Sequence, residues 1–268
     1  MPRTRIRRLP GTAVAAALCA LLLTPSAPSS AAETDSYVAM GDSYSAGNGA
    51  HSTNLSPLCG RNTYAYPYLV ARQRPHTSLT FVACQGATTD DIPGQARYLS
   101  ADTDYVSLTI GGNDIGFGGL LLGCTGDWSP GCDTAVAHSE HVIRHELPGE
   151  LDRAYATIRA AAPNATVVVL GYARLFGPDV GCAAADGVTA AEARQLNRIA
   201  DDLDKAIAAR AAAAGFVYVS SIRHFTGHDM CAADPWLNGK LPDAADAYHP
   251  TRRGYAHGLA PELRSAIG

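Results

Sequence analysis

Residues 166–170 read Thr166-Val167-Val168-Val169-Leu170, so four apolar side chains follow one another without a break. A strand that is exposed on one face alternates apolar and polar residues, whereas a strand buried on both faces does not. Strands of the second kind belong to parallel sheets with helices on both sides. This run therefore predicts one strand of a covered parallel sheet.

Four other short apolar runs are also rich in β-forming residues. They are Tyr37–Met40, Leu79–Ala83, Tyr105–Ile110 and Phe216–Val219. Helical patterns separate most of the runs, and this alternation predicts an α/β fold. We expect a three-layer α/β/α sandwich with about five parallel strands, in the flavodoxin-like arrangement. No linker or change in composition divides the chain after residue 33, so residues 33–268 are predicted to form one domain.

The predicted helices differ in how clearly they are marked. Ala190–Ala214 has apolar residues at a 3.6-residue period, a capping box of Thr189 and Glu192 at its start, and Gly215 as its stop. A second helical region covers about 133–161 and is expected to break at Pro148-Gly149. A last helix is expected after His249-Pro250.

The N-terminus has the pattern of a secretory signal peptide. Basic residues (Arg3, Arg5, Arg7 and Arg8) precede an apolar run, 13–23, and then the small residues Ser30-Ala31-Ala32. A run of this length is shorter than the ~20 residues that a bilayer span needs, so a membrane anchor is disfavoured. Residues 1–32 are predicted to be removed near Ala32, which makes the protein secreted and extracellular.

The net charge and the length of the apolar runs disfavour two classes of partner, nucleic acids and membranes. The leader carries four arginines and no acidic residue, so its removal changes the formal net charge from −4 to −8. An acidic protein repels phosphate backbones, so no nucleic-acid partner is expected. No second apolar run approaches ~20 residues, so no integral membrane span is expected. We also predict a monomer, with at most transient contact with a lipid interface.

Six cysteines remain after Cys19 leaves with the leader, and an even count is typical of disulfides in an oxidising compartment. They are Cys59, Cys84, Cys124, Cys132, Cys182 and Cys231. Sequence alone allows about 15 pairings, of which consecutive pairing is the simplest. No Cys-x-x-Cys pair occurs, so a zinc ribbon or a thioredoxin-like site is disfavoured. We expect no metal and no cofactor.

Chemically useful residues follow the predicted strands, where parallel sheets form their binding sites. Ser43 follows the first strand and is expected to begin a helix, so that its N–H points toward an oxyanion. The Gly86 N–H and the Asn113 side chain would complete an oxyanion hole. His249 is the candidate base for Ser43, and Asp246 is placed to orient its Nδ1.

Other interpretations of these residues are open. Gly-Asp-Ser and Gly-Gly-Asn-Asp are common turns, and Asp246 and His249 alone could be a cap and a surface histidine. Ser45 lies in a near match to the G-x-S-x-G elbow, which would make it the nucleophile instead. A metal could use the histidines at 138, 141 and 145, which share one helix face, although a solvated face is the simpler interpretation.

The chain resembles the SGNH (GDSL-type) hydrolases, and among them the secreted streptomycete lipases and phospholipases. The resemblance rests on 41–45 (Gly-Asp-Ser-Tyr-Ser), Gly86, 111–114 (Gly-Gly-Asn-Asp) and 246–250 (Asp-Ala-Tyr-His-Pro), in the family's order. Tyr44 stands where the family's name has Leu.

The resemblance implies a five-stranded parallel sheet between helices and a nucleophile–base pair of Ser43 and His249. It also implies an oxyanion hole of Ser43, Gly86 and Asn113, and disulfides in three sequential pairs, Cys59–Cys84, Cys124–Cys132 and Cys182–Cys231. In some members a main-chain carbonyl orients the histidine, which leaves the role of Asp246 open.

We therefore predict a secreted serine ester hydrolase, a lipase or carboxylesterase, that forms an acyl-Ser43 intermediate and releases it with water. Residues 120–122, three leucines, could form an acyl-chain wall or could simply pack in the core. Lipids or small esters are the expected substrates. The alternative is a phospholipase A1 or B, and a polysaccharide acetyl esterase or a non-catalytic binding protein on the same scaffold is less favoured.

Overall fold

The computed structural model describes residues 1–2, 4, 11, 34–125 and 131–268. Most of the predicted signal peptide, including its cleavage site, lies outside these residues. The chain divides into Met1–Glu33 and Thr34–Gly268, and the second unit is the one described below. None of the helices that the structure describes is both long and apolar enough to cross a membrane.

The core of this unit is a five-stranded sheet in the order β2-β1-β3-β4-β5, and every neighbouring pair is parallel. The strands are β1 (Asp35–Ala39), β2 (Thr77–Phe81), β3 (Tyr105–Leu108), β4 (Thr166–Leu170) and β5 (Val217–Val219). In β4 the last four residues are buried, as their unbroken apolar character predicts. The predicted α/β fold is confirmed.

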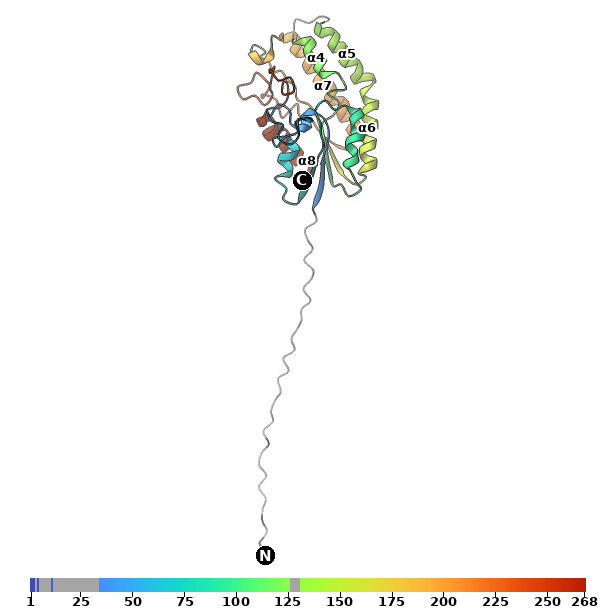
Figure 1. The fold of residues 1–268 in the computed structure, drawn as a ribbon, viewed down its shortest axis with the longest axis vertical. Helices are drawn as coiled ribbons and strands as arrows, with labels where there is room; N and C mark the ends of the chain where they lie inside the picture. The colour runs from blue at the N-terminus through green and yellow to red at the C-terminus, as the bar shows by residue number, and fades with distance from the viewer. Residues whose placement is uncertain (3, 5–10, 12–33, 126–130) are drawn as a thin grey trace. The chain divides into compact units, whose positions relative to one another are not determined.

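Helices cover both faces of the sheet (Figure 1). On one face α2 (Tyr66–Ala71) packs against α8 (Ala260–Ile267). The helices of the other face are α3 (Ile92–Gln95), α5 (Gly131–His145), α6 (Leu147–Ala161) and α7 (Ala190–Ala213), with α4 (Phe117–Cys124) packed on α5. Such a division follows from right-handed crossovers between parallel strands.

Several short elements complete the fold. They are the helix α1 (Ser43–Ala46), the 3₁₀ turns η1 (Thr89–Asp91), η2 (Ala96–Tyr98) and η3 (Ala183–Ala185), and the π-helical segment η4 (Gly254–Leu259). The η4 segment continues directly into α8, so the helix predicted after Pro250 has two parts.

The break in the second helical region comes earlier than the sequence suggests. The structure ends α5 at His145 and begins α6 at Leu147, so Pro148 lies in the first turn of α6. Proline is tolerated in a first helical turn because its missing N–H would have no intrahelical partner there. Pro148 therefore starts a helix and does not interrupt one.

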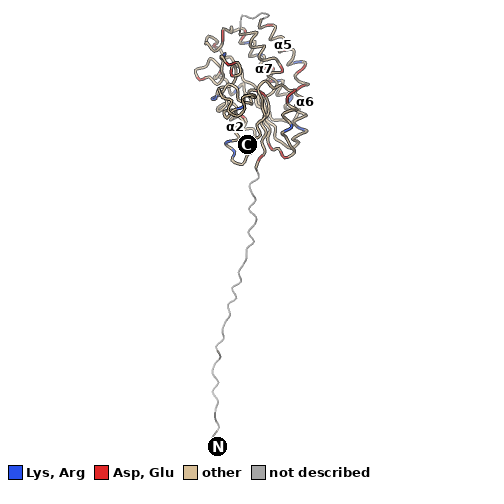
Figure 2. Tube along the Cα trace, viewed as in Figure 1, with Lys and Arg blue, Asp and Glu red and all other residues tan. Residues whose placement is uncertain are grey.

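Capping residues and charged surface residues stabilise the long helices. The Thr189 N–H donates to Glu192 (2.8 Å) and the Glu192 N–H donates to Thr189 (3.2 Å), which is the predicted capping box of α7. Acidic and basic residues are interspersed along α5, α6 and α7 (Figure 2). One ion pair, Arg210 with Asp152 at 2.7 Å, joins α7 to α6.

The six cysteines form three disulfides in sequential pairs: Cys59–Cys84, Cys124–Cys132 and Cys182–Cys231. The first ties a loop that precedes α2 to the end of β2, and the second ties α4 to α5. In this way the covalent links hold the loops at the carboxyl edge of the sheet, where the candidate site lies.

Candidate active site

Ser43 is the first residue of α1 and comes four residues after the end of β1. Asp42 caps this short helix, because its carboxylate accepts a hydrogen bond from the Tyr44 N–H (3.0 Å). Among the residues that the structure describes, the Ser43 N–H donates to no acceptor. The N–H at the start of the helix is therefore free to bind an oxyanion beside the Ser43 side chain.

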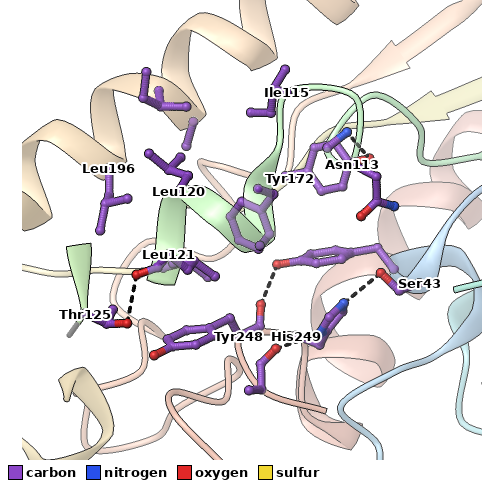
Figure 3. Close-up of a pocket in the computed structure, with 18 of the residues that line it drawn as sticks. Ser43, Asn113, Ile115, Leu120, Leu121, Thr125, Tyr172, Leu196, Tyr248 and His249 are labelled. Carbon is purple, nitrogen blue, oxygen red and sulfur yellow. Dashed lines mark hydrogen bonds between the residues drawn. The ribbon is translucent and has the colours of Figure 1, made fainter. Parts of the chain in front are cut away.

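His249 contacts Ser43 directly, with 2.7 Å between Nε2 and the Ser43 Oγ (Figure 3). Its Nδ1 lies 2.7 Å from the Ala247 carbonyl oxygen, which can only accept. The proton of a neutral imidazole is thus on Nδ1, and Nε2 presents its lone pair to the serine hydroxyl. Burial lowers the pKa of His249 to about 4, which keeps the ring neutral.

The sequence left open whether Asp246 or a main-chain carbonyl contacts His249 Nδ1, and in the structure the carbonyl does so while Asp246 bonds elsewhere. One carboxylate oxygen of Asp246 accepts from the Gly49 N–H (2.6 Å) and the other lies 2.9 Å from His51 Nδ1. Tyr248 adopts a φ of 61°, which brings the Ala247 carbonyl back to the imidazole. A main-chain carbonyl therefore occupies the position that a triad would give to a carboxylate.

Tyr44 supports this turn of the chain from the α1 side. Its hydroxyl donates to the Tyr248 carbonyl (3.0 Å), and its ring lies 5.2 Å from the ring of His249. The residue that departs from the family's name thus links the serine segment to the histidine segment.

The Asn113 side chain lies on the same cavity as Ser43 and His249 (Figure 3). One Nδ2 hydrogen is donated to the Ala87 carbonyl (2.9 Å), and an amide has a second that remains available. This bond brings the loop after β3 next to the loop after β2, which contains Gly86. Gly86 has a φ of +78°, a conformation that favours glycine, and a Cβ placed there would contact nothing within 4 Å.

Asp42 is buried at the base of the site. The Thr109 hydroxyl donates to one of its oxygens (2.6 Å), and the Tyr172 hydroxyl donates to the other. Burial raises the pKa of Asp42 to about 6, although these hydrogen bonds oppose the shift. The Asp42 carboxylate therefore has a structural role: it accepts hydrogen bonds that hold the chain next to Ser43 in place.

An apolar cavity of about 730 Å³ opens at Ser43. Leucines from α4 and α7, among them Leu120, Leu121 and Leu196, line one side of it (Figure 3). The three leucines at 120–122 all line it; Leu120 and Leu121 are buried, whereas Leu122 is 67% exposed. The two interpretations of this run are therefore compatible, since the same side chains pack in the core and line the cavity.

The rival site residues have other roles. Ser45 is fully buried, and its Oγ bonds to the hydroxyls of Tyr66 (2.8 Å) and Thr109 (2.9 Å). The histidines at 138, 141 and 145 lie on the exposed face of α5. His141 contacts Glu146 at 3.4 Å and the ring of His145. These contacts suit a solvated helix face.

Sequence reasoning missed Tyr172 and the contribution of α7 to the cavity, and it left open whether Asp246 or a main-chain carbonyl orients His249. The period of α7 predicted a buried face, but a period cannot show whether that face meets side chains or a cavity. A main-chain carbonyl carries no signal in the residue types at all.

Comparisons with known proteins agree with this geometry. The pattern of the GDSL-like lipase/acylhydrolase family matches residues 39–257. A protein named Lipase 1 from Streptomyces coelicolor is 39% identical over 250 residues, which cover 91% of this chain and 92% of that protein.

Two solved structures are also similar over most of their length. An extracellular lipase from Streptomyces rimosus has a TM-score of 0.83 at 39% identity, covering 87% of this chain and 100% of that one. A phospholipase A1 from Streptomyces albidoflavus has a TM-score of 0.82 at 41% identity, covering 87% and 99%.

Proposed function

The chain belongs to the GDSL-like lipase/acylhydrolase family and is a carboxylic ester hydrolase, and we propose that it cleaves fatty-acyl esters of lipids through an acyl-enzyme on Ser43. One observation carries the proposal: the Ser43 Oγ lies 2.7 Å from the unprotonated Nε2 of His249 at the mouth of an apolar cavity. A serine becomes a good nucleophile when a neighbouring base can take its proton.

In the acylation step, the Ser43 Oγ attacks the ester carbonyl carbon while its proton passes to His249 Nε2. The carbonyl oxygen becomes an oxyanion, which the N–H groups of Ser43 and Gly86 and the Asn113 side chain would bind. Collapse of this intermediate breaks the bond to the alcohol oxygen. His249 returns the proton to that oxygen, so the alcohol leaves neutral and the acyl group stays on Ser43.

Deacylation repeats the sequence with water as the nucleophile. His249 takes a proton from the attacking water, and the second tetrahedral intermediate uses the same oxyanion donors. When it collapses, the proton returns to the Ser43 Oγ and a carboxylic acid is released. In both steps the Ala247 carbonyl accepts a hydrogen bond from His249 Nδ1, so the proton stays on that nitrogen. The imidazolium forms only transiently.

Shape and lining of the cavity support a fatty-acyl substrate. Its volume of about 730 Å³ is within the usual ligand-pocket range, and leucines and isoleucines are prominent in its wall. An acetyl group would leave most of this apolar space unfilled, so polysaccharide acetyl esters are disfavoured. Phospholipase A1 activity is the second candidate, because the phospholipase A1 from Streptomyces albidoflavus is 41% identical.

We also infer that the protein is exported and acts as a monomer. Export is supported by the basic and apolar leader within residues 1–32, by three disulfides, and by the extracellular lipase among its relatives. Mass analysis of the protein from culture medium would locate the cleavage site, and size-exclusion chromatography with light scattering would give the oligomeric state.

Three variants test the mechanism on p-nitrophenyl butyrate. Ser43→Ala and His249→Ala are expected to lose at least about 10³-fold in kcat, because each removes a group that acts as a unit with the other. Asp246→Asn should stay within about 10-fold, since its carboxylate does not touch His249, whereas removal of a triad aspartate costs about 10⁴-fold. Ser45→Ala is the control for a neighbouring hydroxyl and should keep its rate. Wild-type turnover by Ser43→Ala would reject the proposal.

A substrate panel then tests the acyl specificity. It comprises p-nitrophenyl esters from C2 to C16, a triglyceride, phosphatidylcholine and acetylated xylan. We expect kcat/KM to rise with chain length beyond C4. Release of the sn-1 fatty acid from phosphatidylcholine would favour the phospholipase A1 candidate, and a preference for acetyl esters would contradict the fatty-acyl assignment.

A further inference from the structure

The Tyr172 phenol oxygen connects the ends of three neighbouring strands. Tyr172 follows β4, and its hydroxyl donates a hydrogen bond to Asp42, which follows β1. The same oxygen accepts from the N–H of Gly112 (3.1 Å), which follows β3. Since β1, β3 and β4 are adjacent in the sheet, one side chain spans the edge on which the candidate site lies.

The two partners of Tyr172 are the immediate neighbours of two proposed oxyanion donors. Asp42 precedes Ser43, whose N–H is one donor, and Gly112 precedes Asn113, whose amide is another. Asp42 also caps α1 through the Tyr44 N–H, so its position sets the direction of the first N–H groups of that helix. A change in the distance between Asp42 and Gly112 would therefore change the distance between the Ser43 N–H and the Asn113 amide.

Gly112 is shaped to admit the Tyr172 ring. A Cβ on Gly112 would lie 3.0 Å from Cζ of Tyr172 and 3.2 Å from its hydroxyl oxygen. Gly112 is not among the glycines with positive φ, so a side chain there would be opposed by the contact with the ring and not by the backbone conformation. The Tyr172 ring also packs against the Tyr44 ring in a T-shaped arrangement, at a centroid distance of 5.1 Å.

We propose that Tyr172 is a positioning residue that sets the distance between the oxyanion donors of Ser43 and Asn113. It does so through its hydrogen bonds to Asp42 and Gly112 and takes no proton from the substrate. The inference rests on the proposed roles of Ser43 and Asn113. Because the donors are needed mainly when charge develops on the carbonyl oxygen, their spacing matters for the transition state more than for binding of the ester.

The test compares Tyr172→Phe with Tyr37→Phe. Tyr37 is also buried and its hydroxyl bonds to Ser107 inside the sheet, so the control removes one buried hydroxyl away from the site. With p-nitrophenyl butyrate, Tyr172→Phe is expected to lower kcat about 10- to 100-fold while KM stays within about 2-fold, since small displacements of catalytic groups have costs of this size. Tyr37→Phe should keep both constants near the wild type.

A boronic acid provides a readout that a purely structural role would not change. Butylboronic acid adds to the serine and forms a tetrahedral anion, so its inhibition constant should rise in Tyr172→Phe by the same factor by which kcat/KM falls. Gly112→Ala keeps the hydroxyl but displaces the ring, and it should lower kcat in the same way. It serves as the test if Tyr172→Phe does not fold.

The outcomes separate this inference from the proposed function. Full activity of Ser43→Ala overturns both. If Ser43→Ala is inactive while Tyr172→Phe or its substitute Gly112→Ala has the kcat of Tyr37→Phe, only the role of Tyr172 is overturned. An unchanged boronate inhibition constant, or an increase of KM without loss of kcat, also overturns it.

Discussion

At the scale of single residues, His249 combines a fixed tautomer with a weakly basic ring. The Ala247 carbonyl holds the proton on Nδ1, and burial lowers the pKa of the ring to about 4. A carbonyl carries no full negative charge, so it stabilises the imidazolium less than a carboxylate would. The oxyanion that forms at the same time must therefore supply much of the balancing charge.

The pKa of His249 predicts how kcat/KM decreases at low pH, in the acid limb of the activity profile. The free enzyme needs neutral His249, so kcat/KM should rise as pH increases through about 4 and should be level by about pH 6. An ordinary histidine would place the limb near 6.5. The measurement is kcat/KM for p-nitrophenyl butyrate from pH 4 to 8, with tryptophan fluorescence to confirm that the protein stays folded. A limb near 6 or above would contradict this prediction.

The residue scale also separates what sequence can and cannot predict about the site. Ser43, Asn113 and His249 follow strands or lie in the C-terminal loop, and their residue types carry the chemistry, so they could be chosen from the sequence. Asp246 had the right type and spacing, but the φ of Tyr248 turned a backbone carbonyl to the ring in its place. A positive φ at a non-glycine residue is uncommon and is not foreseen from residue type.

At the scale of secondary-structure elements, we propose that α4 and α7 form part of the wall that the acyl chain contacts. Leu121 of α4 and Leu196 of α7 both line the cavity (Figure 3). Leu121→Trp is expected to fill part of that space. For p-nitrophenyl esters of C12 to C16, kcat/KM should fall at least about 10-fold, while C2 and C4 esters should change less than about 3-fold, because only long chains need the lost volume.

The control for this variant is Leu55→Trp. Leu55 is 46% exposed and does not line the cavity, so the same substitution there changes side-chain volume without obstructing the acyl site. Its chain-length profile should match the wild type. An equal loss for short and long esters in Leu121→Trp would indicate damage to the catalytic groups and contradict the assignment of this wall.

Elements with a clear period were predictable, and short ones were not. The structure has the five predicted strands, although β2 covers 77–81 and not 79–83, and α7 ends at Ala213, one residue before the predicted end. The shift of β2 arises because its ends depend on pairing with β1, which the sequence of β2 alone does not show. The four-residue helix α1 is too short for a period, and its start at Ser43 was inferred only from the chemistry expected there.

At the scale of the whole molecule, the Cys59–Cys84 disulfide links the loop before α2 to the loop after β2, which contains the proposed oxyanion donor Gly86. Gln85, beside Gly86, donates its N–H to the Cys59 carbonyl (3.0 Å) and its side-chain amide to the Leu58 carbonyl (3.0 Å). Asn48, from the loop after α1, donates to the Gln85 side chain (2.7 Å). The disulfide and these hydrogen bonds thus hold the loop that contains Gly86.

Removal of this disulfide should lower both stability and activity. For Cys59→Ser/Cys84→Ser, we expect the free energy of unfolding to fall by about 2–4 kcal/mol, because the unfolded chain regains the freedom of the closed loop. We also expect kcat for p-nitrophenyl butyrate to fall about 10-fold, since Gly86 is held less firmly. The measurements are urea unfolding and steady-state kinetics at a temperature where both proteins are folded.

The matched control is Cys182→Ser/Cys231→Ser. This disulfide closes a sequence separation of 49 residues, compared with 25 for Cys59–Cys84, so its removal should destabilise at least as much in the chain-entropy account. Its cysteines do not contact the Gly86 segment, and kcat should therefore remain within about 2-fold of the wild type. An equal loss of kcat in the two double variants would mean that activity follows global stability. In that case the Cys59–Cys84 disulfide would have no specific part in holding the loop that contains Gly86.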